Sequence, residues 1–250
     1  MRYRRSPAIL TAILLGACGG GSPTSPSDSA PLSERLVTAH FVFHFAANDR
    51  VDTEWLEAYH AWAVAQLSVS PPVIEYNKYR NRAHLAALTG HSATNGYAEP
   101  AQGVVHTISP SDGHEVVHVY TNQWGFPVAF FVEGIAVAYQ VNPPAGDFVP
   151  RWRGAPVHDV ARGFRATGQL LPIASIAETA VFRTRDELVT YPESGSFVRY
   201  LVDTEGLDPL RRLFGTIGID APLATVRSAF QQTYGFSLEE AERRWLEFLR

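Results

Sequence analysis

Cysteine is nearly absent from this chain, because Cys18 is the only one among its 250 residues. A single thiol cannot close an internal disulfide, so no disulfide framework stabilises the fold. Positive charge is not in excess, since the formal net charge is −4, and nucleic acid is therefore not an expected partner. No repeat or low-complexity tract follows residue 32. The chain does have 46% hydrophobic and 12% aromatic residues, which is enough for the packed core of one catalytic-sized domain.

The N-terminal residues have the features of an export signal. Three arginines among the first five residues precede an apolar run at 8–15 that is too short to span a bilayer. The run ends in a Leu-Gly-Ala-Cys tetrapeptide at 15–18, which resembles the bacterial lipobox, where the peptide is cut before the cysteine and the thiol carries a lipid. We therefore expect a signal peptide at 1–17 and lipidation of Cys18, with an ordinary secreted protein as the alternative.

A segment rich in Gly, Ser and Pro follows the signal. Residues 18–32 have a composition that cannot bury a core and suits a flexible tether, so the folded domain is expected at 33–250. Gly19, rather than Asp, follows Cys18, which in enteric bacteria would imply passage to the outer membrane. The expected location is outside the cytoplasm, lipid-anchored to the cell envelope, at the outer membrane or periplasmic face of a Gram-negative cell.

Hydrophobic patterning predicts an α+β domain with a small N-terminal mixed sheet and a mainly helical C-terminal half. Before residue 110, strands are expected over 36–46, 73–79 and 103–108, and helices over 53–67 and 80–88. After residue 125, helices are expected over 128–141, 194–204, 208–217, 221–234 and 238–249. The intervening residues 142–163 are expected to form loops.

One HExxH pentapeptide, at residues 114–118, carries most of the functional information. A turn at 109–113 with good N-cap residues predicts that a helix starts there and runs to about Trp124. On that helix His114 and His118 are one turn apart on the same face, so both imidazoles can reach one metal ion. Glu115 stands beside them and can move a proton. The spacing therefore predicts a zinc site with a neighbouring base.

The next helix supplies a candidate third ligand. Residues 128–141 form a predominantly apolar segment with one charge, Glu133. Burial of an unpaired carboxylate costs on the order of several kcal/mol, so Glu133 needs a partner, and a metal ion would supply one. A metzincin would instead need a third His six residues after His118, but Trp124 stands there, which excludes that subclass. Two His and one carboxylate leave a fourth zinc position for water.

These two motifs together resemble a known family. The sequence FVEGIA at 131–136 is similar to the xxEGxA signature of the peptidase MA-like (gluzincin) zinc metallopeptidases, and Glu133 stands fifteen residues beyond His118, where a gluzincin keeps its glutamate. Looser similarity covers most of 36–250, including a turn at 96–98. The resemblance implies a zincin-like fold, one Zn²⁺ ion and hydrolysis of peptide bonds. It also implies that Gly134 lets the motif helix and the next helix approach closely.

The resemblance implies roles for individual residues. His114, His118 and Glu133 would hold the zinc ion, and Glu115 would take a proton from the attacking water and pass it to the leaving amine. Gluzincins also use a Tyr or His to stabilise the oxyanion, and Tyr191 is the candidate here because it leads the helix that family members place near the zinc.

The sequence alone leaves the partner that orients the zinc-binding His and the choice between two functions open. In thermolysin-like enzymes an Asp four residues after the glutamate ligand orients a zinc-binding His, but Val137 stands at that position, so the orienting partner is unassigned. The alternative function is an envelope lipoprotein that binds peptides or partners through a structural or vestigial zinc site. The presence of Glu115 and the lack of a fourth protein ligand argue against it. The expected partners are a peptide or protein substrate and, through Cys18, a lipid membrane.

Overall fold

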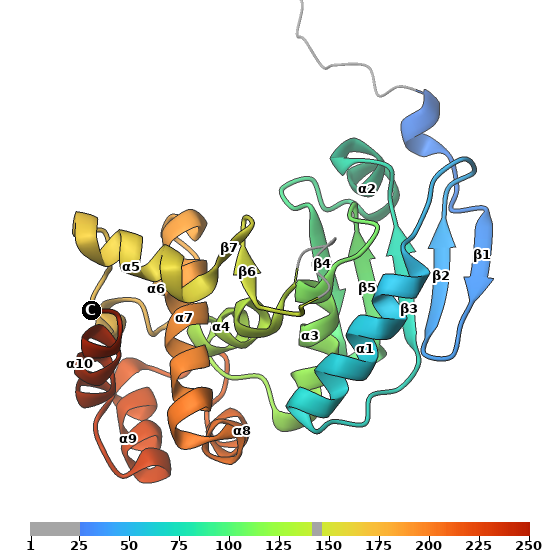
Figure 1. Ribbon diagram of the computed structural model, residues 1–250. Coiled ribbons are helices and arrows are strands. Elements are labelled where there is room, and N and C mark those ends of the chain that lie inside the picture. The colour runs from blue at the N-terminus through green and yellow to red at the C-terminus, as the bar shows by residue number, and fades with distance from the viewer. Residues whose placement is uncertain (1–25, 142–146) are drawn as a thin grey trace, which may run out of the picture.

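A computed structural model describes residues 26–141 and 147–250, which form a small β-sheet region followed by a helical region (Figure 1). The N-terminal elements are β1 (Glu34–Val37), β2 (Phe41–Phe45), α1 (Thr53–Leu67), β3 (Ile74–Lys78), α2 (Arg82–Thr89), β4 (Gly96–Glu99), β5 (Val104–Thr107) and α3 (Gly113–Thr121). The later elements are α4 (Ala129–Tyr139), β6 (Arg151–Trp152), β7 (Ala155–Pro156), α5 (Val157–Thr167), α6 (Thr179–Phe182), α7 (Glu187–Glu205), α8 (Leu207–Thr216), α9 (Leu223–Tyr234) and α10 (Leu238–Phe248). The expected combination of a small mixed sheet and a mainly helical C-terminal half is confirmed.

The sheet has the order β1-β2-β3-β5-β4. The three central strands are parallel, and the two edge strands β1 and β4 run antiparallel to their neighbours. Alternate residues of the central strands, such as Phe43, Tyr76 and Val105, are completely buried and lie in register on one face. Helix α3 contacts α1, β4 and β5, so the HExxH helix lies beside the edge strand β4.

Several expected boundaries differ from the structure. The predicted strand 36–46 is two strands, β1 and β2, because the chain turns back between them and they pair antiparallel. The segment 96–98, expected as a turn, belongs to strand β4. Residues 142–163, expected as loops, include β6, β7 and the first half of α5. Helix α7 begins at Glu187 rather than at residue 194, because the Asp186 side chain caps it by accepting a hydrogen bond from the Leu188 backbone amide.

Two glycines allow helices α4 and α7 to pack closely. A Cβ atom on Gly134 would lie 2.7 Å from Cγ2 of Val198 and 3.0 Å from the backbone oxygen of Ser194, both on α7. The expectation that Gly134 serves the contact between the motif helix and α4 is therefore wrong. Gly195 on α7 faces Val137 of α4 in the same way. The helix that carries Glu133 is thus held against α7 by residues too small to keep the backbones apart.

The expected signal peptide at 1–17 and the lipidation site Cys18 lie outside the described residues. The last part of the expected tether does have structure, since Pro26–Ser29 forms a short 3₁₀ helix that contacts α2. The backbone oxygen of Ala30 accepts a hydrogen bond from Nε2 of the buried His84 at 2.7 Å. Contacts with the domain therefore begin before residue 33. None of the helices in 26–141 and 147–250 has the length and apolarity that a membrane crossing requires.

Candidate metal centre

The HExxH histidines lie on α3, whose start is tied to the sheet. Oδ1 of Asp112 accepts a hydrogen bond from the backbone amide of Glu115 and caps the helix. The other carboxylate oxygen accepts a bond of 2.6 Å from the hydroxyl of Thr107 at the end of β5. Val116, Val117 and Tyr120 are completely buried, which fixes the rotation of α3 about its axis. Both histidines consequently face α4.

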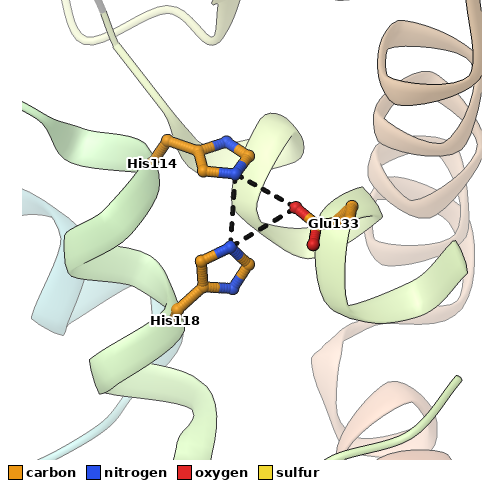
Figure 2. Close-up of side chains that lie close together, drawn as sticks. All are labelled: His114, His118 and Glu133. Atoms are coloured by element: carbon orange, nitrogen blue, oxygen red, sulfur yellow. Dashed lines mark hydrogen bonds and ion pairs between the residues drawn. The ribbon is translucent and has the colours of Figure 1, made fainter. Parts of the chain in front are cut away.

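Three side chains converge at one point, as Figure 2 shows. Nε2 of His114 lies 3.2 Å from Nε2 of His118 and 3.2 Å from Oε2 of Glu133, and Nε2 of His118 lies 3.4 Å from the same oxygen. An ion held tetrahedrally at about 2.0–2.1 Å from each ligand places neighbouring ligand atoms about 3.3–3.4 Å apart. The triangle formed by these atoms therefore has the dimensions that a tetrahedral metal site requires. Together these residues form a group that could hold a metal ion.

The charges at this point are strongly coupled. Burial alone would lower the pKa of His114, but the hydrogen bond to Glu133 and the charges of Glu115, Glu133 and Asp112 raise that pKa to about 9. Burial would raise the pKa of Glu133, but the nearby His118 and His114 hold it well below its usual range. In the metal-free protein the carboxylate is therefore ionised, and its attraction keeps a proton on His114.

Glu115 lies in the same cavity as the three candidate ligands. The cavity has a volume of about 510 Å³, within the range of small-molecule and peptide sites, and both Tyr97 of the edge strand and Tyr191 of α7 line it. Burial raises the pKa of the Glu115 carboxyl to about 7, against the opposing effect of His114 and His118. A carboxyl group with a pKa in that range can exchange a proton with a bound substrate or water near neutral pH.

A glutamine orients the first histidine, and the sequence did not reveal it. Nδ1 of His114 donates a hydrogen bond of 2.8 Å to Oε1 of Gln140, whose Nε2 donates in turn to the backbone oxygen of Arg151 at 2.8 Å. With its proton on Nδ1, the imidazole presents the lone pair of Nε2 to the metal position. Val137, which stands where thermolysin-like enzymes have an orienting Asp, packs instead against Gly195 of α7.

An arginine at the C-terminal cap of α6 completes the surroundings of Glu133. Nη2 of Arg183 lies 2.6 Å from Oε1 of Glu133, and Nη1 of the same guanidinium donates to the hydroxyl of Tyr191 at 2.9 Å. The Tyr191 ring stacks on the His114 ring with centroids 6.0 Å apart. Burial, followed by the charge of Glu133, raises the pKa of Tyr191 above its usual range, so its hydroxyl keeps its proton. Spacing along the sequence gave no signal for Arg183.

The structure thus brings together all five of the site residues predicted within the described part of the chain: His114, Glu115, His118, Glu133 and Tyr191. The structure also places Gln140 beside His114 and Arg183 beside Glu133. No pattern in the sequence predicted either residue. Comparison with known proteins assigns no family, because no protein-family model matches the chain and no curated protein matches it significantly.

Proposed function

We propose that the protein is a zinc-dependent peptidase of zincin-like, gluzincin type. His114, His118 and Glu133 would hold one zinc ion, and Glu115 would be the general base. The observation that carries this proposal is the triangle of ligand atoms, with sides of 3.2, 3.2 and 3.4 Å, at the wall of a cavity that also contains Glu115. The similarity of residues 131–136 to the gluzincin signature is consistent with it.

The donor atoms fit zinc better than the harder cations. Two imidazoles and one carboxylate are a common ligand set of catalytic zinc, whereas calcium and magnesium prefer oxygen ligands alone. A structural zinc site is closed by four protein ligands, but the group in the described ranges contains three. Bound zinc would supply a Lewis acid for the substrate carbonyl and would lower the pKa of a water molecule to about 7.

The protein groups around the metal position have distinct tasks in this proposal. Glu115 accepts the proton of the attacking water and returns it to the leaving amine, a task suited to a buried carboxyl group whose pKa is raised to about 7 in the metal-free protein. The hydroxyl of Tyr191 donates a hydrogen bond to the oxyanion that develops on the carbonyl oxygen. Gln140 keeps His114 in the tautomer that can bind zinc.

The lipobox-like tetrapeptide at 15–18 supports a proposal about location. We propose that the peptidase is exported and attached to the cell envelope by lipid on Cys18. Radiolabelled palmitate should then be incorporated into the wild-type chain and not into Cys18→Ser. Equal labelling of both chains would contradict lipidation at this residue.

Metal analysis combined with a peptide-library cleavage assay tests the proposed activity. Wild-type protein should contain about one zinc ion per chain and cleave peptides, while Glu115→Gln should keep the zinc ion and lose cleavage. Glu75→Gln removes an exposed carboxylate on the sheet, away from the cavity, and serves as the matched control. Absence of zinc from the wild-type protein would refute the proposed site. Bound zinc without cleavage of any peptide would favour the alternative of a non-catalytic envelope lipoprotein.

A further inference from the structure

We propose that Arg183 is a positioning residue that serves the metal ligand Glu133 and the oxyanion candidate Tyr191 at once. This inference rests on the proposed zinc peptidase function and deepens it. Its basis is one guanidinium group that donates from two different nitrogens, one to the carboxylate on α4 and the other to the hydroxyl on α7. The contact joins three elements whose relative positions determine the geometry of the site.

The first task of Arg183 is to bind one carboxylate oxygen of Glu133, so that only the other oxygen faces the metal position. Oε2 faces both histidines, and in Figure 2 the dashed lines from His114 and from His118 to Glu133 end at that one oxygen. Oε1 is bound by Nη2 of Arg183 at 2.6 Å. A charge-assisted bond of this length keeps Oε1 from approaching the metal position. Glu133 would therefore bind a metal ion through Oε2 alone, and together with the two histidines it would leave a fourth ligand position for water.

The second task concerns the direction of the Tyr191 proton. A phenol hydroxyl has one proton to donate and can accept hydrogen bonds on its oxygen. Nη1 of Arg183 donates to that oxygen at 2.9 Å, so the tyrosine proton is not used in this contact and is free for another acceptor. Tyr191 lines the cavity together with Glu115 and the candidate ligands. The guanidinium thus prepares the hydroxyl to donate to an oxyanion in the cavity.

Arg183 can perform both tasks because α6 is fixed to α4. The side chain of Thr179, at the start of α6, accepts a hydrogen bond of 2.9 Å from the backbone amide of Ala129, at the start of α4. Phe182, next to Arg183, is 1% exposed and packs against the rings of Phe130 and Tyr191. The arginine side chain itself remains 47% exposed. In a variant without the guanidinium, the buried Glu133 still has His114 and His118 as charge partners, so the protein should remain folded.

Arg183→Ala tests the first task through zinc affinity, measured by competition with a chromophoric chelator. We expect binding about 10–100-fold weaker than in the wild type, the range observed when a group that orients a metal ligand is lost. The absorption spectrum of the cobalt-substituted protein should also change, because Glu133 becomes free to bind through both oxygens. Arg185→Ala removes the same charge from an exposed neighbour on the same segment and is the matched control.

The second task is tested by steady-state kinetics and a double-mutant cycle. Arg183→Ala should lower kcat about 10–100-fold at saturating zinc, with a smaller change in KM, and added guanidinium ion should restore part of the loss. In a Tyr191→Phe background, Arg183→Ala should lower kcat by a clearly smaller factor, because the two side chains act as a unit. Arg183→Lys, which cannot reach both partners with one planar group, should recover zinc affinity better than kcat.

The outcomes separate this inference from the proposed function. Wild-type protein that neither binds zinc nor cleaves peptides would refute the function itself. If the wild type does both and Arg183→Ala matches Arg185→Ala in zinc affinity, cobalt spectrum and kcat, the inference about Arg183 is wrong. Fully additive effects of Arg183→Ala and Tyr191→Phe on kcat would refute the second task alone.

Discussion

Gln140 lies 2.8 Å from Nδ1 of His114 and caps the same helix, α4, that carries Glu133. One helix therefore supplies a candidate metal ligand and also the group that orients a candidate ligand on another helix. Any shift of α4 relative to α3 moves both contacts together. The relative positions of these side chains thus depend on how α4 is packed. Every residue of α4 is buried against other elements.

Substitution of Gln140 by Met tests this relationship. Met fills a similar volume but cannot accept the proton of His114, so the imidazole loses its fixed tautomer and orientation. We expect zinc affinity to fall about 10–100-fold, measured by chelator competition at neutral pH. Gln123→Met, at an exposed position just beyond α3, should leave the affinity unchanged. Equal affinities in all three proteins would show that Gln140 does not support the ligand.

The metal-free protein should release a proton when it binds zinc at neutral pH. The pKa of His114 is raised to about 9, so its imidazole is protonated at pH 7 and must lose that proton to bind metal. Glu133 releases none, since its pKa lies well below the usual range. Zinc affinity should therefore weaken by about tenfold or more for each unit by which pH falls below about 9.

Calorimetric titrations with zinc in buffers of different ionisation enthalpy would measure this proton directly. The apparent binding enthalpy should depend on the buffer at pH 7. A buffer-independent enthalpy at pH 7 would contradict a protonated His114. Glu133→Gln should reduce the release, because the attraction that holds the proton is removed.

The candidate ligands were predictable because their signals are local. A spacing of four residues on one helix fixes His114 and His118, and Glu133 stands out as the lone charge of an apolar helix. Gln140 and Arg183 have no such signal, because their partners lie 26 and 50 residues away along the chain. Which glutamine or arginine reaches the site depends on how α3, α4 and α6 pack, and hydrophobic periodicity does not encode that arrangement.

The elements of the fold that have a local sequence signal were predicted correctly, whereas those that depend on contacts distant in the sequence were not. Helix α1 was predicted with its correct ends, since Asp52 provides a clear N-cap signal. The start of α7 was missed because Pro192, which normally marks a helix boundary, lies inside it. Edge strand β4 was interpreted as a turn because its four residues become a strand only through pairing with β5. Short segments of this kind are defined by tertiary contacts.

Gly195→Ala should destabilise the protein by about 1–3 kcal/mol, because the added methyl group would overlap Val137 across the α4–α7 contact. Denaturant titration of the metal-free protein gives the change in the free energy of unfolding. Val137→Ala combined with Gly195→Ala should recover part of the loss, since it removes Cγ1 of Val137, the nearest of the overlapping atoms. Gly163→Ala is the matched control: this glycine lies inside α5 with open space around it, and there the alanine should stabilise by about 0.5–1 kcal/mol. Similar effects of both alanines would contradict a packing cause.

Glu193 on α7 should make the stability of the fold depend on pH. Its side chain is completely buried, and burial raises the pKa of its carboxyl to about 8, although the backbone amide of Leu171 donates to it at 3.1 Å. A carboxyl group whose pKa is higher in the folded than in the unfolded chain binds a proton on folding. Its favourable contribution to stability is therefore complete below the ordinary carboxyl pKa of 4.5 and is lost as pH rises to about 8.

Glu193→Gln should remove this dependence, because the amide keeps an oxygen that can accept from Leu171 and never ionises. Between pH 5 and 9 the free energy of unfolding of the wild type should fall by an amount on the order of a few kcal/mol relative to the variant, with the difference growing as pH rises. Denaturant titrations at several pH values measure it, and Glu75→Gln, at an exposed position on β3, controls for the loss of one carboxylate. Parallel pH profiles for the wild type and Glu193→Gln would contradict this prediction, because they would show that the pKa of Glu193 is the same in the folded and the unfolded chain.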